Sequence, residues 1–367
     1  MRILAIDMGT GTQDILLFDS AQHVENSVKL ILPSATEIAA RRIRRAQRER
    51  RPLVLTGTVA GGGPCSWALE SFLRDGGRAF ATPEAAQTID DDLERVRGLG
   101  VTLVSADEAS SIDAEHVELR DLDLDALRAA LQRFEVDAGF DGFALGCLDH
   151  GAAPPGVSDR LFRFDHLKRT VEARNDLLAF ATAAADLPDY LTRARSMVRC
   201  AVAEAPTAFM DTGPAAALGA LHDETVAGAE ETIIMNLGNM HLLAFHLRGR
   251  KIASLYEHHT GEIPTPRIVE FTEALARGAL THEEVFHSSG HGTFHADRSL
   301  VPARLPRLVA ATGPQRSKIR GSALRPYFAA PFGDMMIGGC FGLLRAFAEV
   351  YPWSRDAIES RLGPLGA

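Results

Sequence analysis

Residues 3–18 read ILAIDMGTGTQDILLF, and this stretch decides the fold class. Two apolar runs, 3–7 and 14–19, are typical of buried strands, and a turn rich in glycine and threonine joins them. Glycine permits positive φ and close backbone approach, so successive N–H groups of such a turn can point at phosphate oxygens. The stretch therefore predicts an anion-binding hairpin at the start of an α/β fold.

A second hairpin of the same kind lies about 230 residues further along the chain. Its sequence, IIMNLGNMHLLAF at 233–245, matches the first stretch with a two-residue gap in the turn, so that Asn236 falls on Asp7 and Gly238 on Gly9. Internal repetition of a strand–turn–strand unit indicates a duplicated domain. We therefore expect two lobes, residues 1–205 and 206–367, with a cleft between them.

Strands and helices alternate through the rest of the chain, as they do in α/β folds. The pattern predicts a helix at 36–51 with Thr36 as its N-cap, a helix at 85–98, and helical structure at 160–203. A helix of small residues is expected at 215–220 and a glycine-rich one at 338–350.

Composition argues against several classes of protein. The 367 residues are 46% hydrophobic, which is enough for two packed domains. The net charge of -9 argues against a nucleic-acid binder, which needs a basic face, and the basic run at 41–51 is expected to be a solvated helix face. No apolar stretch approaches the roughly 20 residues that span a bilayer, and no signal peptide is evident, so we expect a cytoplasmic protein. Cysteines at 65, 147, 200 and 340 form no CxxC pair and no zinc or iron–sulfur framework.

Five segments, in a fixed order, resemble the signature motifs of the sugar-kinase/Hsp70/actin superfamily. They are the two hairpins, DTGPAAALGA at 211–220, LVAATGPQR at 308–316 and GDMMIGGCFGLL at 333–344. This resemblance implies two duplicated actin-like (RNase H-like) domains with a nucleotide cleft between them. It also implies that the small residues of the segments at 211–220 and 333–344 let two connecting helices pack closely.

Within the superfamily, the chain resembles a prokaryotic family labelled pyruvate formate-lyase activating enzyme. The strings that carry this resemblance are TG at 56–57, GGGP at 61–64, DHG at 149–151, EHHTG at 257–261 and GHG at 290–292.

The superfamily resemblance implies MgATP as the cofactor. Asp7, at the end of a buried strand, would bind Mg²⁺ through water or orient an attacking oxygen. The residues expected to contact ATP are Gly9, Thr10, Gly11, Thr12 and Gln13 in the first turn, Gly238, Asn239 and His241 in the second, and Gly313, Pro314, Gln315 and Arg316 around the adenosine. The second turn departs from the usual pattern, since it has Asn and His where an acid and hydroxyls are common.

Acids and histidines at expected strand ends are the candidate catalytic groups. Carbohydrate kinases commonly use an Asp near the first connecting helix as base, so the base here could be Asp211 or Asp149, or be absent. His150, Glu257 and His258 lie where α/β sheets place ligand-contacting groups, and they could form an acid/base pair or a divalent-metal site.

A second anion site is expected at Gly61, Gly62 and Gly63, which precede a helix whose first turn contains proline. We assign this turn to a substrate, together with His259 and His291. His287 lies four residues before His291, but Gly290 and Gly292 argue against the continuous helix that a helical metal pair needs.

The leading hypothesis from sequence is an ATP-dependent small-molecule kinase or related phosphotransferase. One alternative is an ATPase switch that acts on a partner protein. Another is a metal-dependent hydrolase or lyase that uses the same His, Glu and Asp residues without a nucleotide. The expected partners are a small-molecule substrate or a partner protein, and a homodimer is compatible with the sequence.

Overall fold

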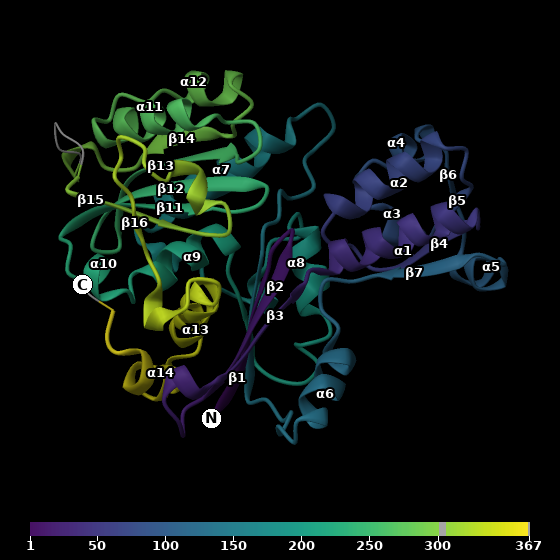
Figure 1. The fold of residues 1–367 in the computed structure, drawn as a ribbon, viewed down its shortest axis with the longest axis horizontal. Coiled ribbons are helices and arrows are strands. Elements are labelled where there is room, and N and C mark those ends of the chain that lie inside the picture. Colours follow the sequence, from purple (N-terminus) through teal and green to yellow (C-terminus); the bar gives the residue numbers. More distant parts are fainter. Residues whose placement is uncertain (301–305, 366–367) are drawn as a thin grey trace.

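The computed structural model describes residues 1–300 and 306–365, which form two six-stranded sheets with the strand orders β3-β2-β1-β8-β10-β9 and β14-β13-β12-β11-β15-β16 (Figure 1). In the first sheet β1, β2 and β3 form an antiparallel meander, and β8 and β10 run parallel to β1. In the second sheet β11, β12 and β13 form an antiparallel meander, and β15 and β16 run parallel to β11. The strands of the first sheet are β1 (Arg2–Met8), β2 (Thr12–Asp19), β3 (Val28–Pro33), β8 (Gly142–Cys147), β9 (Thr182–Ala183) and β10 (Thr207–Phe209). Those of the second are β11 (Glu231–Leu237), β12 (His241–Arg248), β13 (Lys251–His259), β14 (Gly292–His295), β15 (Leu308–Thr312) and β16 (Tyr327–Phe328). This repeated topology confirms the duplicated actin-like fold.

The two hairpin turns have the same length. Met8 pairs with Gln13 across the first turn, and Leu237 pairs with Leu242 across the second, so four residues lie between the paired residues in both. The amide of Gly9 donates to the carbonyl of Thr12 at 2.9 Å, and the amide of Gly238 donates to that of His241 at the same distance. The two-residue gap expected between the repeats is therefore wrong, because the strand pairing aligns them without one.

Two helices, α9 (Thr212–Ala220) and α13 (Gly338–Val350), lie side by side between the two sheets (Figure 1). A Cβ atom added to Gly219 would lie 1.8 Å from the carbonyl oxygen of Gly338, and one added to Gly342 would lie 1.9 Å from that of Ala215. The backbones of the two helices are thus in direct contact. This confirms the close packing of small residues that the sequence indicated.

We predict that Gly219→Ala destabilises the protein by about 1–3 kcal/mol, the usual cost of overpacking a tight interface. Thermal unfolding should show a lower midpoint. The matched control is Gly98→Ala, since that glycine is also helical but has open space around it. An equal effect of both substitutions would contradict close helix packing as the cause.

A third unit, not anticipated from the sequence, is inserted between β3 and β8. Its four parallel strands have the order β6-β5-β4-β7 and project from the first lobe at the right of Figure 1. Its strands are β4 (Leu53–Gly57), β5 (Ala79–Ala81), β6 (Val101–Leu103) and β7 (Glu115–Leu119), and its helices are α1 (Ala35–Glu49), α2 (Pro64–Arg74), α3 (Pro83–Ala86), α4 (Leu93–Gly98) and α5 (Ala106–Ser111). β10, which follows residue 206, belongs to the first sheet, so the chain enters the second lobe after this strand.

Several helix predictions need correction. Ser34 caps α1, and its side chain accepts from the amide of Glu37, whereas Thr36 lies inside the helix and hydrogen-bonds to the Gly62 loop. The helix expected at 85–98 is two short helices, α3 and α4. The segment 160–203 contains α7 (Asp159–Ala173) and α8 (Thr192–Val198), with 3₁₀ turns and β9 between them. The other helices are α6 (Leu124–Arg133), α10 (Glu224–Ala227), α11 (Thr265–Ala276), α12 (His282–His287) and α14 (Arg355–Leu362).

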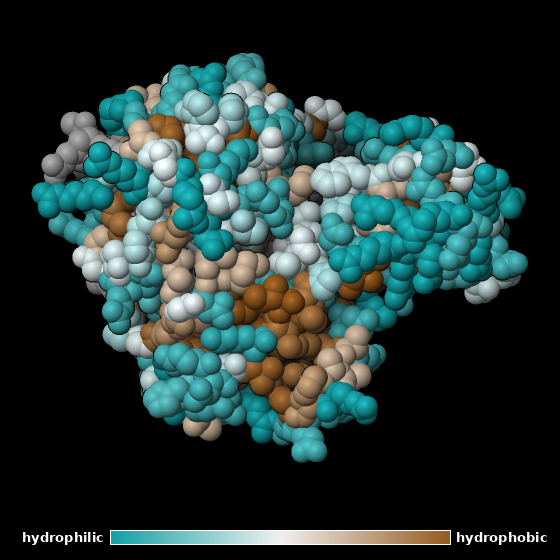
Figure 2. All heavy atoms as spheres, in the orientation of Figure 1, coloured by the Kyte–Doolittle hydropathy of each residue, from teal (hydrophilic) through white to brown (hydrophobic). Residues whose placement is uncertain are grey.

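The surface is polar over most of the face in Figure 2, with one apolar area over the β1–β3 ribbon. The apolar side chains exposed on edge strand β3 are Ile31 and Leu32, at 47% and 38%. Within residues 1–300 and 306–365, none of the helices has the length and apolar character needed to cross a membrane.

Candidate active site

Both hairpin turns line one cleft between the lobes. The residues that line it include Met8, Gly9, Thr10 and Thr12 from the first turn, Gly238, Asn239, Met240 and His241 from the second, and Thr312, Gly313 and Pro314 at the end of β15. The turns meet at one point, because a Cβ added to Gly11 would lie 2.4 Å from Nδ2 of Asn239. The three segments that resembled nucleotide motifs are therefore brought to a single cavity.

Asp7 lies in this cleft, close to the N-terminal ends of both central helices. Its Oδ1 accepts a hydrogen bond from Oγ1 of Thr212, the first residue of α9. A Cβ on Gly339, the second residue of α13, would lie 2.0 Å from Asp7 Oδ2. Helix N-termini carry partial positive charge, so this part of the cleft favours an anionic ligand.

A second carboxyl group, that of Asp14, pairs with Asp7 across the β1–β2 hairpin and also lines the cleft. Burial, and then the charge of Asp14, raise the pKa of Asp7 to about 8, while burial raises the pKa of Asp14 to about 7. Oδ1 of Asp14 is buried and has no hydrogen-bond partner among the described residues. Asp7 is buried, Asp14 is half-buried, and neither pairs with a basic side chain among the residues that the structure describes, so the two fit a Mg²⁺ ion, which prefers carboxylate oxygens.

These raised pKa values predict that the metal-free protein loses stability as the pH rises. In the unfolded chain the Asp7 carboxyl ionises near its ordinary value of 3.8, whereas in the folded protein it holds its proton to about pH 8. Between these values the folded state binds more protons, so deprotonation favours unfolding. Thermal unfolding in chelator should show a midpoint that falls from pH 5 to pH 8, and Asp7→Asn should flatten this fall. An unchanged slope in the variant would contradict the assignment.

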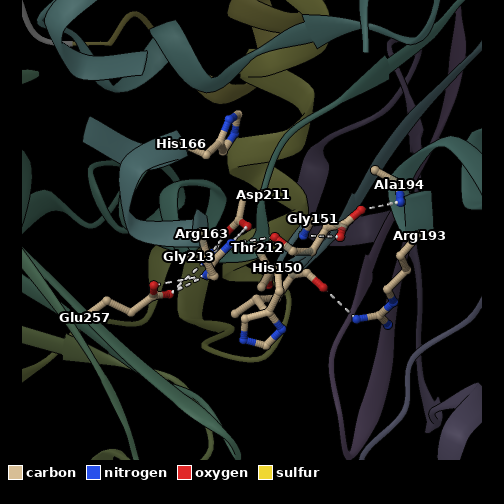
Figure 3. Close-up of polar contacts among 12 residues, drawn as sticks. His150, Gly151, Arg163, His166, Arg193, Ala194, Asp211, Thr212, Gly213 and Glu257 are labelled. Carbon is tan, nitrogen blue, oxygen red and sulfur yellow. Dashed lines mark hydrogen bonds and ion pairs between the residues drawn. The ribbon is translucent and has the colours of Figure 1, made fainter. Parts of the chain in front are cut away.

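The side chain of Arg163, on α7, is fully buried at the junction of the lobes (Figure 3). Its guanidinium donates to Glu257 at 2.7–3.0 Å, to Asp211 Oδ2 at 2.7 Å, and to the carbonyl of Asp149 at 3.0 Å. Asp211 also caps α9, since its Oδ1 accepts from the amide of Gly213 at 3.0 Å. Two of the acids expected to be catalytic, Asp211 and Glu257, are therefore engaged in one buried ion-pair network.

Asp149 is also occupied, because its two carboxylate oxygens accept the backbone amides of Gly151 and Ala194 at 2.8 and 2.9 Å (Figure 3). The loop is held further by Arg193, which donates to the carbonyl of Leu148 at 2.7 Å and pairs with Asp121. The geometry therefore gives Asp149 a role in fixing this loop. The sequence does not predict the roles of Arg163 and Arg193, because an arginine that pairs inside the protein looks the same in a polar helical segment as one that faces solvent.

A second pocket adjoins the cleft. It is lined by Gly61, Gly62 and Gly63, and by Asp91, Asp149 and His150, and it shares Thr10, Leu148, Arg193, Met240 and His241 with the cleft. The glycine turn precedes α2, as expected from sequence, and the amide of Gly61 donates to Asp121 at 3.1 Å. The expected substrate turn therefore lies next to the expected phosphate turn.

Asp91 is a candidate group that sequence analysis missed. It lies in the loop before α4, and its carboxylate forms no hydrogen bond or ion pair with the residues that the structure describes. The residue is exposed overall, but partial desolvation, followed by the charge of Asp149, raises its pKa to about 6. Its only sequence signal is a run of three aspartates, 90–92, which is common on protein surfaces.

Of the five histidines predicted to lie at the site, four come together and one does not. His150, His241, His259 and His291 come together, with neighbouring ring centroids 4.7–5.6 Å apart. His258 points to the opposite face of β13 from Glu257 and His259, because side chains alternate along a strand. Its ring nitrogens contact the carbonyl of His259 and the hydroxyl of Ser288, so the structure does not bring this candidate to the cleft.

Some predicted ATP contacts lie outside the cleft. Gln13 donates to the carbonyl of Pro33 at 3.0 Å, and Arg316 folds back to donate to that of Gly313 at 3.1 Å. Gln315 reaches the second turn, where its amide donates to Asn239 at 3.1 Å. The turn of this segment needs glycine, since Gly313 has a φ of 92° and a Cβ there would lie 2.5 Å from the carbonyl oxygen of Leu237.

The sequence model of the family described as "Putative pyruvate format-lyase activating enzyme (DUF1786)" matches residues 60–318. The chain belongs to this family. The name of the family implies an activating enzyme of the radical type. Such an enzyme needs a CxxxCxxC motif to hold an iron–sulfur cluster. In this member Cys65, Cys147 and Cys340 are buried apart from one another and Cys200 is exposed, so the residues do not fit such a cluster.

No match among curated proteins is found. Solved structures with a similar outline include a Listeria monocytogenes protein described as "a putative N-acetylmannosamine kinase" (9% identity, TM-score 0.34, 95% of this chain and 99% of that one). Others are a ROK hexokinase from Thermus thermophilus (13%, 0.28, 95% and 88%) and an exopolyphosphatase from Cytophaga hutchinsonii (13%, 0.26, 85% and 66%). At these identities and scores, the assignment of the fold rests on the strand order described above.

Proposed function

We propose that this protein is a MgATP-dependent phosphotransferase that acts on a small molecule. The observation that carries the proposal is the convergence of both hairpin turns and the Gly313 turn on one cleft, with Asp7 between two helix N-termini. Backbone N–H groups of glycine-rich turns bind phosphate oxygens, and helix N-termini favour negative charge. The first and second turns would hold the phosphates from opposite lobes, and Gly313 and Pro314 would contact the adenosine.

Asp7 and Asp14 would hold Mg²⁺. When bound, this ion would neutralise charge on the transferred phosphoryl group, which is most of what phosphoryl transfer requires beyond positioning. The acceptor would occupy the pocket at Gly61–Gly63, so that its reacting oxygen meets the phosphates near Thr10, which lines both cavities.

Asp91 is the candidate for accepting the proton of the acceptor hydroxyl. A general base works best when its pKa lies near the operating pH, and the pKa of Asp91 is raised to about 6. The acids expected from sequence, Asp149 and Asp211, are committed to backbone amides and, for Asp211, also to Arg163. This favours Asp91 over both of them.

The test is a transfer assay with γ-labelled ATP, Mg²⁺ and fractionated small-molecule pools, using the full-length protein. The proposal expects label in a small molecule and formation of ADP that requires an acceptor fraction. Hydrolysis that no small molecule stimulates, but that a partner protein does, would favour the ATPase switch instead. Absence of both ATP binding and ATP turnover would contradict a nucleotide function.

Gly313→Ala is expected to weaken ATP binding by about tenfold or more, a loss of about 1.4 kcal/mol, because the added Cβ displaces the turn against Leu237. The matched control is Gly321→Ala. That glycine also has a positive φ, of 73°, but its Cβ would meet no atom within 4 Å. Calorimetric titration of both variants with ATP separates the local effect from backbone strain. Equal affinities would argue against adenosine binding at Gly313.

A further inference from the structure

Four histidine rings gather where the two lobes meet, beside the cleft. His150 follows β8 in the first lobe, whereas His241, His259 and His291 lie at one end of neighbouring strands of the second sheet. His241 begins β12, His259 ends β13, and His291 directly precedes β14. His241 and His259 are direct cross-strand partners. One ring nitrogen each of His150, His241 and His291 lies within 4.8 Å of the other two. Side chains from both lobes thus converge on one point.

Hydrogen bonding does not account for this arrangement. Nε2 of His150 and Nε2 of His291 are 3.5 Å apart. Nε2 of His241 and Nδ1 of His291 are buried and have no hydrogen-bond partner among the described residues. A neutral imidazole has one donor and one acceptor nitrogen, and buried polar atoms normally find partners. The cluster therefore contains ring nitrogens that the protein itself leaves unsatisfied.

The chemistry of the cluster suits a transition metal. Metal ions bind neutral imidazole, and burial keeps the rings neutral by lowering the pKa of His150 to about 3 and the pKa of His241 and His291 as well. In a tetrahedral site with Zn–N bonds of about 2.0–2.1 Å, ligand nitrogens are about 3.4 Å apart. The His150–His291 pair is already near that separation, and a ring nitrogen of His241 lies within 4.8 Å of both. The positive charge of nearby Arg163 is matched by Asp211 and Glu257.

We propose that His150, His241 and His291 bind one divalent transition-metal ion of the zinc type. Three histidines with an open fourth position are a ligand set of catalytic zinc sites. His150 and His241 also line the pocket at Gly61–Gly63, so the open position faces that pocket and would take an oxygen of the acceptor, a hydroxyl or a carboxylate. The metal site itself is independent of ATP chemistry, while its contact with the acceptor rests on the proposed function. Because its ligands come from both lobes, the ion also links them.

The experiment titrates the chelator-treated, full-length protein with Co²⁺ and with Zn²⁺, followed by visible absorption and calorimetry, without ATP. One equivalent of Co²⁺ should bind and give the absorption bands of a site rich in nitrogen ligands. His150→Asn and His291→Asn should each weaken binding beyond the roughly 10–100-fold that loss of a second-shell partner costs. Wild-type binding in both variants, or no saturable binding in the wild type, would overturn the proposal.

Two controls make the result specific. His287→Asn should leave binding unchanged, because His287 is exposed although it lies four residues before His291. Asp7→Ala should also keep the Co²⁺ site, and loss of the bands in that variant would instead place the ion at the Mg²⁺ position and overturn the assignment. Circular dichroism checks that the variants fold. His150 is less buried than His291, so His150→Asn decides the question if His291→Asn does not fold. Since ATP is absent, failure of the phosphotransferase proposal leaves these outcomes interpretable.

Discussion

Replacing Asp7 by alanine is expected to lower ATP turnover by about a hundredfold or more. The side chain lies in the cleft against the N-termini of α9 and α13, and with the half-buried Asp14 it forms the pair of carboxyl groups best suited to Mg²⁺. A metal that neutralises transferring phosphoryl charge contributes several kcal/mol, and each 1.36 kcal/mol is a tenfold change in rate. Steady-state ATP consumption across a range of Mg²⁺ concentrations measures the effect.

The fold should survive this substitution. Burial disfavours the ionised Asp7 carboxylate, so its removal is expected to leave the metal-free protein at least as stable at pH 8. Asp19→Ala is the matched control, because Asp19 ends the same hairpin at its far side and pairs with Arg2 near the surface. Normal turnover in Asp7→Ala would exclude Asp7 from the reaction.

Arg163→Met is expected to destabilise the protein by about 3–5 kcal/mol. Removing one partner of a buried ion pair leaves an uncompensated charge, and Arg163 is the shared partner of Asp211 and Glu257, with its side chain 0% exposed. The loss should appear as a lower midpoint in denaturant unfolding, at unchanged slope. Arg169→Met, on the exposed side of the same helix, should have little effect.

A triple variant tests the cause of this loss. Combining Arg163→Met with Asp211→Asn and Glu257→Gln removes the stranded negative charges, so it should recover part of the stability. A triple variant that is less stable than Arg163→Met would show that the hydrogen bonds of the two acids to the rest of the protein, and not their charge, matter more.

The active-site cleft was predictable from sequence to the extent that its parts are local. The turn at Gly9–Thr12 and the small residues of α9 and α13 are visible in the sequence, because a tight turn with close backbone approach and a close helix contact each require particular residue types. The length of the second turn was misjudged, since Thr12 and His241 have no resemblance and only strand pairing shows that they correspond.

The state of each acid could not be predicted in the same way. Asp149, Asp211 and Asp91 are all aspartates, so the sequence does not distinguish their states. In the structure the carboxylates of Asp149 and Asp211 accept hydrogen bonds from backbone amides, and Asp211 also pairs with Arg163. The carboxylate of Asp91 has no partner among the described residues. These differences depend on partners that are distant in sequence, such as the amide of Ala194, 45 residues from Asp149, and Arg163, 48 residues from Asp211. Partners at such separations leave no periodic signal.

The sequence by itself determined the duplicated fold, the first glycine-rich turn with Asp7 before it, and the helix contact between α9 and α13, since all of these depend on local patterns of apolar and small residues. Only the tertiary structure decided that the region between β3 and β8 forms a separate sheet, that Arg163 neutralises two expected catalytic acids, and that His150, His241 and His291 meet. The physical reason is that a ligand set or an ion pair requires proximity in space. That proximity is fixed by the docking of two lobes whose contributing residues are up to 141 positions apart.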